Sequence, residues 1–197
     1  MKSGKWCSAR EALRQSIQPG DRIFFSIASG QPQTLLRALA EDSQFYRDVE
    51  VINGILFAEH PLAKKGLESS FRCISFQNSA SLRQDWVEGR IDFLPVRYSD
   101  VPRVFSRKGP KPLGVVLIQV SPPDHRGRFS LGVSTSHAYP LALEARTIVA
   151  IPSLCNSRER FSCGRSGREQ EETRGTSEGR LPVSGVARCR VLSGAPL

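Results

Sequence analysis

The sequence has no run of 18 apolar residues, so it predicts no membrane-spanning helix. Its first residues, MKSGKWCSAREALRQ, carry lysines without the apolar stretch that follows them in a secretory signal. Cysteines are few, odd in number and without a CxxC pair. The five cysteines are Cys7, Cys73, Cys155, Cys163 and Cys189. We therefore expect neither a disulfide framework nor a zinc site, and we predict a reducing, cytoplasmic location.

The motifs of several enzyme classes are missing too. The chain has neither GxGxxG nor Walker spacing, and it has no GxSxG nucleophile elbow. Asp124, His125 and Ser130 lie close in sequence, but three neighbours on one Pro- and Gly-rich loop do not define a triad. An Asx-turn by Asp124 and hydrogen bonds of Ser130 are the favoured interpretation. His60 and His137 have no metal-ligand partner at helical spacing, which favours solvated or capping roles for both.

The net charge of +9 is spread along the chain. Residues 1–150 hold 20 Lys and Arg against 14 Asp and Glu, and residues 151–197 hold 8 Arg against 5 Glu. The excess in the first part is scattered, without a dense basic stripe that carries interleaved aromatics. This distribution disfavours a nucleic-acid-binding surface and favours a solvated basic one.

The most informative segment present is 115–132, VVLIQVSPPDHRGRFSLG. Val115–Val120 is a continuous apolar, β-branched run with one polar residue, Gln119, which is typical of a strand buried on both faces in a parallel sheet. Ser121-Pro122-Pro123-Asp124 then ends it, because proline has no N–H for a ladder. Ligands of open α/β sheets bind beyond the carboxyl ends of strands, where this loop falls.

Helix and strand signals alternate along residues 1–151. The predicted strands are Arg22–Ala28, Val49–Phe57, Phe71–Phe76, Ile91–Val96, Val115–Val120 and Thr147–Ile151, with a short β segment at Phe129–Val133. The predicted helices are Ser8–Ile17, Gln33–Glu41, Ser81–Glu88 and His137–Arg146, with a short helix or turn near Pro102. Such alternation predicts an α/β fold: a mostly parallel open sheet with flanking helices.

Several of these segments resemble one family. The stretch from Gln119 to Ser134, QVSPPDHRGRFSLGVS, is similar to a signature of the acetyl-CoA hydrolase/CoA-transferase family, in its N-terminal domain. Matching segments in the same order are 17–22 (IQPGDR), 29–32 (SGQP) before LLRAL, 94–102 (LPVRYSDVP) and 141–150. The family normally continues with an acidic residue, a Val-Asn pair and a Met-Pro. This chain instead reads IPSLCNSRERFSCGRSG.

The resemblance implies acyl exchange between an acyl-CoA and a short carboxylic acid, with no permanently bound cofactor and coenzyme A thioester as the substrate. A basic surface near the cleft would aid capture of this polyanion. Family enzymes attack the thioester with a glutamate of the C-terminal domain. No residue of this chain matches that motif, so no catalytic residue is assigned. The resemblance also implies that the N-terminal domain forms walls of the active-site cleft. We assign these walls to Gly30, Gln31, Pro32, Ser121, Pro122, Pro123, Asp124, Gly127, Ser130, Leu131 and Gly132.

The remaining segment, 152–197, is an Arg-, Gly-, Ser- and Glu-rich tail with neither strand nor helix periodicity. We expect residues 1–151 to form the domain and the tail to be disordered, because it buries too little apolar surface to offset the entropy of ordering. Two further interpretations stay open. In the first, the reading frame has shifted after about residue 150, so that the tail is not a natural continuation of the domain. In the second, the tail binds RNA through its arginines.

These observations predict a CoA-transferase or acetyl-CoA hydrolase domain with little activity alone. Three alternatives remain: a CoA-binding or half-enzyme module that pairs with a separate C-terminal domain, a sugar-phosphate isomerase-like enzyme of related architecture, and nucleic-acid binding through the tail. Loss of a partner domain would expose an apolar face, so self-association into a homo-oligomer is a further hypothesis.

Overall fold

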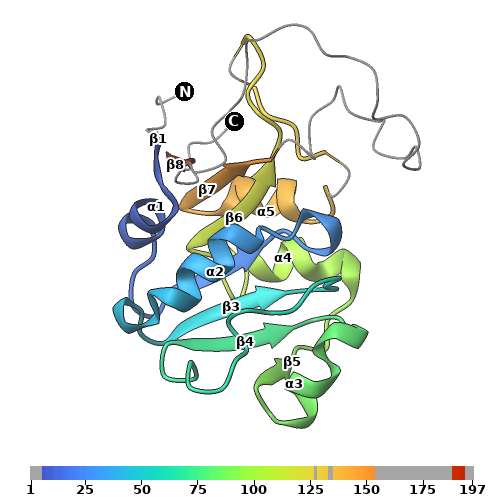
Figure 1. Ribbon diagram of the computed structural model, residues 1–197. Coiled ribbons are helices and arrows are strands. Elements are labelled where there is room, and N and C mark those ends of the chain that lie inside the picture. Colours follow the sequence, from blue (N-terminus) through green and yellow to red (C-terminus); the bar gives the residue numbers. More distant parts are fainter. Residues whose placement is uncertain (1–5, 127, 133–134, 154–187, 194–197) are drawn as a thin grey trace, which may run out of the picture.

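The computed structural model describes residues 6–126, 128–132 and 135–153, together with the backbone of residues 188–193. These residues form one eight-stranded sheet with helices on both faces (Figure 1). The strands are β1 (Trp6–Ser8), β2 (Arg22–Phe25), β3 (Val49–Asn53), β4 (Phe71–Ser75), β5 (Ile91–Phe93), β6 (Val115–Val120), β7 (Thr147–Pro152) and β8 (Arg188–Ser193). The α-helices are α1 (Ala9–Ser16), α2 (Gln33–Glu41), α3 (Arg83–Val87), α4 (Val101–Phe105) and α5 (Ala138–Glu144). In the described part of the chain, no helix is both long and apolar enough to cross a membrane.

The strand order is β1-β8-β7-β6-β2-β3-β4-β5. Six neighbouring strands, from β7 across to β5, are parallel, which confirms the predicted α/β class. The chain steps from β2 to β5 toward one edge, then returns to place β6 on the other side of β2. The direction of winding therefore reverses between β2 and β6. Because parallel crossovers are right-handed, this reversal places α2 and α5 on opposite faces of the sheet.

Each face of the sheet carries its own hydrophobic cluster, because successive strand residues point to opposite faces. The cluster on the α2 face includes Leu13, Phe25, Leu35, Leu36, Leu39, Val51 and Leu117. The cluster on the α4 and α5 face includes Phe24, Ile52, Phe105, Val116, Ile118, Ala138 and Leu141. Burial on both faces explains why the central strands are almost continuously apolar rather than alternating.

Several elements agree with the sequence to the residue. β6 spans Val115–Val120 and α2 spans Gln33–Glu41, as predicted. At the start of α1, Ser8 is the N-cap residue, and its Oγ accepts a hydrogen bond from the backbone N–H of Glu11 at 3.2 Å. The side chain of Glu11 does not complete a capping box in this arrangement, since its Oε1 accepts from Gln15 instead.

Four strands end earlier than predicted, and β4 does so by one residue, at Ser75 rather than Phe76. β2 ends at Phe25 rather than Ala28, because Ala28 has a φ of 53° and begins a 3₁₀ turn. β3 ends at Asn53 rather than Phe57, and β5 ends at Phe93 rather than Val96. The predicted β segment at Phe129–Val133 is also wrong for its described residues 129–132, which form no strand. Their backbone turns instead, and Gly132 has a φ of 64°.

The tail needs a correction at residues 188–193. These residues form β8, which pairs antiparallel with β7 on one side and with β1 on the other. The prediction of disorder is therefore wrong for this stretch, because RCRVLS pairs with an edge of β7 that would otherwise be open. Neither β1 nor β8 is among the predicted strands. The rest of the predicted tail, residues 154–187 and 194–197, lies outside the described residues.

Candidate functional site

The candidate site lies where the winding of the sheet reverses. The carboxyl ends of all six parallel strands lie along one side of the sheet, which we call the carboxyl-terminal edge. The loops after β2 and β6 leave that edge from adjacent strands. In open α/β sheets, ligands bind beyond the carboxyl ends of the strands at such a switch point. Both segments assigned to cleft walls from the sequence belong to these two loops. The fold therefore brings together residues that lie about 90 positions apart in the chain.

The loop after β2 is tied to the loop after β3. Ala28 holds a positive φ, and its N–H donates to the carbonyl oxygen of Ile55 at 2.9 Å. Gln31 Nε2 donates to the carbonyl oxygen of Glu59 at 2.9 Å, and Gln33 Nε2 donates to the same oxygen at 3.1 Å. A left-handed conformation is costly for alanine and is typical of functional loops. The two glutamines hold the backbone around it in place.

The helix that follows this loop, α2, begins with few free N–H groups. Pro32 lies at its N-cap position. The N–H of Gln33 donates to Gln31 O at 2.9 Å, and Leu35 and Leu36 both donate to Pro32 O. Since these N–H groups already have partners, the start of α2 offers fewer free donors for an anion than a bare helix N-terminus does.

The loop after β6 is organised by two side chains. Ser121 Oγ accepts from Ser130 N at 2.9 Å, while Ser121 N donates to Ser130 O at 2.8 Å. Asp124 accepts from the backbone N–H of Arg126 and Arg128, at 2.9 and 2.8 Å, and from Arg128 Nε at 2.9 Å. This confirms the predicted Asx-type role of Asp124. The backbone bond from Arg128, followed by the other bonds of this turn, lowers the pKa of the Asp124 carboxyl.

The assigned wall residues differ in exposure. Gly30, Gln31, Pro32 and Ser121 are buried. Pro122, Asp124, Ser130, Leu131 and Gly132 are half-buried, and Pro123 is exposed. Gly127 lies outside the described residues. Leu131 packs against the cluster on the α5 face, so the far end of this loop rests on the core.

Unpaired buried polar atoms gather near the carboxyl ends of β2 and β3. Ser26 Oγ, Gln31 Oε1 and Asn53 Oδ1 are buried and have no hydrogen-bond partner among the described residues. The amide of Asn53 donates to Ser75 Oγ at 3.2 Å, so only its oxygen is left over. Each such atom costs about 1–3 kcal/mol of unfolding free energy. Sequence reasoning missed Ser26 and Asn53, although both are polar residues at the ends of apolar strands.

His60 is also buried near this edge, which contradicts the solvated or capping role predicted for it. Its ring packs edge-on against Phe25, with 5.3 Å between ring centroids, and neither ring nitrogen has a hydrogen-bond partner in the described part of the chain. Burial lowers the pKa of His60 to about 4, partly opposed by the charge of Asp85. The preceding residue, Glu59, accepts the bonds from Gln31 and Gln33, and these bonds hold the loop over the sheet.

His137 differs from its predicted role in the same way. It occupies the N-cap position of α5 but makes no side-chain capping bond, and it is buried. Its ring lies 4.0 Å from the Tyr98 ring, centroid to centroid, and burial lowers its pKa. Among the described residues, no three His, Cys, Asp or Glu side chains are placed to hold a metal ion.

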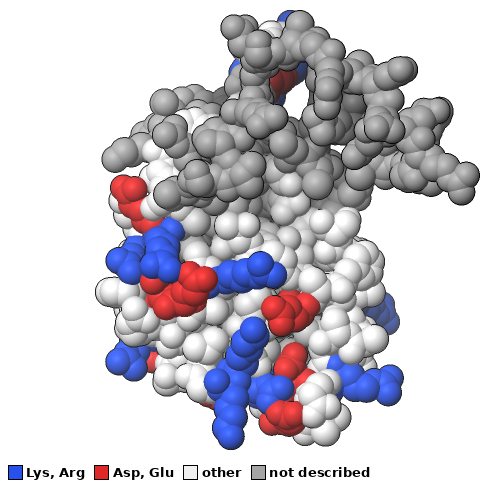
Figure 2. All heavy atoms as spheres, in the orientation of Figure 1, with Lys and Arg blue, Asp and Glu red and all other residues white. Residues whose placement is uncertain are grey.

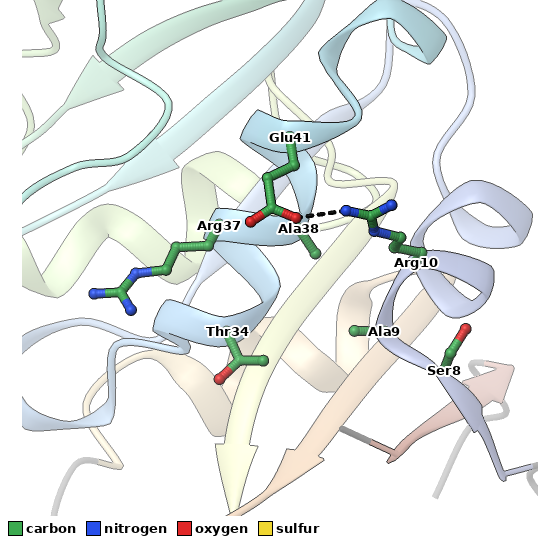
Figure 3. Close-up of a pocket in the computed structure, with 7 residues that line it drawn as sticks. All are labelled: Ser8, Ala9, Arg10, Thr34, Arg37, Ala38 and Glu41. Carbon is green, nitrogen blue, oxygen red and sulfur yellow. Dashed lines mark hydrogen bonds and ion pairs between the residues drawn. The ribbon is translucent and has the colours of Figure 1, made fainter. Parts of the chain in front are cut away.

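A groove of about 650 Å³ lies between α1 and α2 (Figure 3). In Figure 3, Arg10 of α1 and Glu41 of α2 point toward each other and form an ion pair of 2.6 Å, while Arg37 extends away from it. Both partners of this pair are exposed, so the pair contributes little to stability. The groove lies between two surface helices, and none of the residues assigned to the cleft walls lines it.

Charged side chains of both signs alternate over the face seen in Figure 2. Arg10 and Arg14 lie against Glu41 and Asp42, and Arg72 pairs with Asp92. The basic excess is therefore interrupted by carboxylates on the described part of this face. This matches the scattered distribution inferred from the sequence.

Comparison with known proteins identifies the family. The model of the acetyl-CoA hydrolase/transferase N-terminal domain matches residues 3–153. The 4-hydroxybutyrate coenzyme A transferase of Clostridium kluyveri is 31% identical over 146 residues, covering 74% of this chain and 34% of that protein. A succinyl-CoA:acetate/propanoyl-CoA:succinate CoA transferase of Fasciola hepatica is 30% identical over 148 residues, covering 74% of this chain and 30% of that protein.

A solved structure supports the fold. The crystal structure of RipA from Yersinia pestis superposes with a TM-score of 0.64 at 22% identity, covering 73% of this chain and 35% of that chain. The chain thus spans about a third of the length of the curated relatives that it matches.

Proposed function

The chain belongs to the acetyl-CoA hydrolase/transferase family, and from this premise we propose that it supplies one wall of the acyl-CoA site of a CoA-transferase or acetyl-CoA hydrolase. The proposed reaction either transfers coenzyme A from a short-chain acyl-CoA, such as acetyl-CoA, to a short carboxylic acid, or hydrolyses the thioester with water to the carboxylic acid and free coenzyme A. The two relatives described above are CoA transferases by name.

One observation carries this proposal. The loops after β2 and β6, which hold all the assigned wall residues, leave adjacent strands at the switch point of the sheet. The unpaired atoms Ser26 Oγ, Gln31 Oε1 and Asn53 Oδ1 lie near the same edge. Buried polar atoms without partners are rare, and a polar ligand that binds there would supply the missing hydrogen bonds.

The chemistry that we propose needs a carboxylate from elsewhere. A glutamate carboxylate attacks the thioester carbonyl carbon, and the C–S bond breaks. The CoA thiolate departs, and an acyl-glutamate anhydride remains on the enzyme. The CoA thiolate then attacks the glutamyl carbonyl of the anhydride, which releases the first carboxylate and leaves an enzyme–CoA thioester. In a transferase a second carboxylate attacks this thioester and CoA is returned to the new acyl group, whereas in a hydrolase water attacks it and releases free CoA and the glutamate. We place this glutamate in a C-terminal domain, either on the same polypeptide or on a separate partner. The second arrangement makes the chain a half-enzyme module.

Acetyl-CoA binding and turnover by the purified chain test the proposal separately. We expect isothermal titration calorimetry to detect acetyl-CoA binding. We expect a thiol assay with acetyl-CoA and acetate to detect no CoA release above the buffer rate. Turnover by the chain alone would contradict the need for a second domain. A folded chain that binds neither acetyl-CoA nor free CoA would overturn the proposed site.

Two serines provide a matched pair of variants. Ser26→Ala and Ser16→Ala each remove a buried hydroxyl that has no hydrogen-bond partner among the residues that the structure describes. Ser16, however, ends α1, and its carbonyl accepts from Arg146, which directly precedes β7. Ser16 therefore lies toward the opposite edge of the sheet. Both variants should be as stable as the parent or about 1 kcal/mol more stable. Only Ser26→Ala should weaken acetyl-CoA binding, and equal binding by both variants would argue against a ligand at this edge.

A further inference from the structure

Two cysteines face each other in the sheet. β1 and β8 pair antiparallel, with Trp6 opposite Arg190, Cys7 opposite Cys189 and Ser8 opposite Arg188. Cys7 is the second residue of the chain's first strand, and Cys189 is the second residue of its last strand. The register thus joins two cysteines from nearly opposite ends of the sequence. Cysteine spacing alone does not reveal this pair.

The backbone geometry of such a pair suits a disulfide. Directly opposed residues of an antiparallel pair lie on the same face of the sheet. Their Cα atoms are about 5.5 Å apart in a hydrogen-bonded pair and about 4.5 Å apart in a non-hydrogen-bonded pair. Disulfides span Cα separations of about 4.4–6.8 Å, so either kind of pair allows the bond.

We propose that Cys7 and Cys189 form a redox-sensitive disulfide that fastens β8 to β1. In a reducing compartment both remain thiols. A low-molecular-weight disulfide such as oxidised glutathione supplies the oxidant. One cysteine thiolate attacks a glutathione sulfur and releases one glutathione thiolate, and the second cysteine thiolate then displaces the other glutathione. The two cysteines lose two electrons and two protons in total, and oxidised glutathione becomes two molecules of glutathione.

The position at the sheet edge makes the bond consequential. β8 covers the edge of β7, and β1 in turn covers β8. Edge strands open more readily than central strands, so this pair opens often enough for a small oxidant to reach the buried Cys7. A disulfide here closes a loop of almost the whole chain, the class for which the loss of unfolded-chain entropy is greatest. Oxidation therefore adds a covalent link to the ladders that already pair β8 with β7 and β1, and reduction removes that link.

Peptide mapping of the full chain tests the bond directly. The chain is equilibrated with oxidised and reduced glutathione, quenched with acid and N-ethylmaleimide, and digested with trypsin without reduction. Cleavage after Lys5, Arg10, Arg188 and Arg190 places the two cysteines in the peptides 6–10 and 189–190. We expect these peptides to be linked in the oxidised sample and separate after treatment with dithiothreitol. Cys155 and Cys163 fall in other tryptic peptides, so each alternative link has its own mass.

Three single variants sharpen the outcome. Cys7→Ser and Cys189→Ser should each abolish the link. Cys73→Ser should preserve it, because Cys73 lies in β4 opposite Val51 and Ile91 and has no cysteine as a register partner. The proposal is overturned if Cys7 links mainly to Cys155 or Cys163, or if it carries only glutathione at every redox ratio. It is also overturned if the Cys189→Ser variant gives the same oxidised Cys7 species as the parent.

A second measurement uses the parent chain alone, so it does not require any variant to fold. The oxidised parent is treated briefly with trypsin. After a cut between residues 154 and 187, the fragment that bears β8 should stay attached on a non-reducing gel. Addition of dithiothreitol should release this fragment. Release before reduction would contradict the bond.

Discussion

His60 is the residue whose environment departs most from its sequence context. In sequence it precedes a proline in a loop, which is typical of a solvated side chain, yet the fold buries it against Phe25. The residue before it, Glu59, is held by Gln31 and Gln33, which donate to its carbonyl oxygen from a different loop. No local pattern carries that information, because the contact joins segments about 28 residues apart. The Asx-turn of Asp124 was predictable, since all its bonds lie within four residues.

His60 should make stability depend on pH. Its pKa in the folded chain is about 4, below the ordinary 6.5, so the unfolded chain takes up a proton first as the pH falls. This contribution is fully present above about pH 6.5 and is lost as the pH falls toward 4, by roughly 3 kcal/mol in all. Urea unfolding at pH 7.5 and pH 4.5 measures it. His60→Leu should remove most of this difference.

His125, which is exposed in the loop after β6, provides the control. His125→Gln should keep the pH dependence of the parent. A His60→Leu variant with an unchanged pH dependence would show that other groups, such as the buried His137, cause it.

At the scale of elements, type and order were predictable, whereas strand ends were not. Continuous apolar runs predict β6 and β7, because burial on both faces needs apolar residues at every position. The end of β2 depends instead on Ala28, whose positive φ is stabilised by a bond to Ile55 of another loop. An alanine next to an apolar run reads as a continuation of the strand. The sequence therefore predicts which loops follow β2 and β6, but not which individual polar atoms lie at the carboxyl ends of these strands.

The start of α1 offers a test of local stability. Ser8→Ala removes the hydroxyl that accepts from Glu11 N and should lower the unfolding free energy by about 1 kcal/mol. Ser8→Asp keeps an acceptor at the N-cap and should stay close to the parent. Chemical denaturation of the three chains measures both effects. A loss in Ser8→Asp as large as that in Ser8→Ala would show that the cap itself contributes little.

The loop after β6 should depend on Asp124 without affecting the core. Asp124→Ala removes three hydrogen bonds, to Arg126 N, Arg128 N and Arg128 Nε. We expect faster amide hydrogen exchange at residues 126 and 128, with the strand amides of β6 unchanged. In the parent, the lowered pKa of Asp124 means that the turn persists above the ordinary carboxyl range and weakens as the pH falls through the lowered value. Uniformly faster exchange across the sheet would contradict a local role.

At the scale of the molecule, one arginine joins the start of β7 to the turn before β2. Arg146 donates from Nη1 to Asp21 Oδ1 at 3.1 Å, and from Nη2 to Asp21 Oδ2 at 2.7 Å and to Ser16 O at 3.1 Å. Gly114 lies beside this pair, at the start of β6. A Cβ at Gly114 would fall 2.6 Å from Asp21 Oδ1. The contact spans 125 residues, so its geometry follows from the order of the strands rather than from any local sequence.

Gly114→Ala should therefore cost about 1–3 kcal/mol of unfolding free energy. The backbone has little room to move, because Gly114 N donates to Arg22 O at 2.9 Å and Gly114 O accepts from Thr147 N at 3.1 Å. Thermal and chemical unfolding measure the loss. Lys108→Ala, at an exposed position in the same connection, is the control and should be neutral. A Gly114→Ala chain as stable as the parent would show that Asp21 swings aside freely.

The pairing of the first strand with the last has a consequence for synthesis on the ribosome. β1 has β8 as its neighbour in the sheet, so β1, which is translated long before β8, completes its ladder only after residue 190 has left the exit tunnel. The six parallel strands from β2 to β7 are complete some 40 residues earlier in translation. Until then the outer side of β7 is an open template, and another nascent chain on the same messenger is the nearest strand available to fill it.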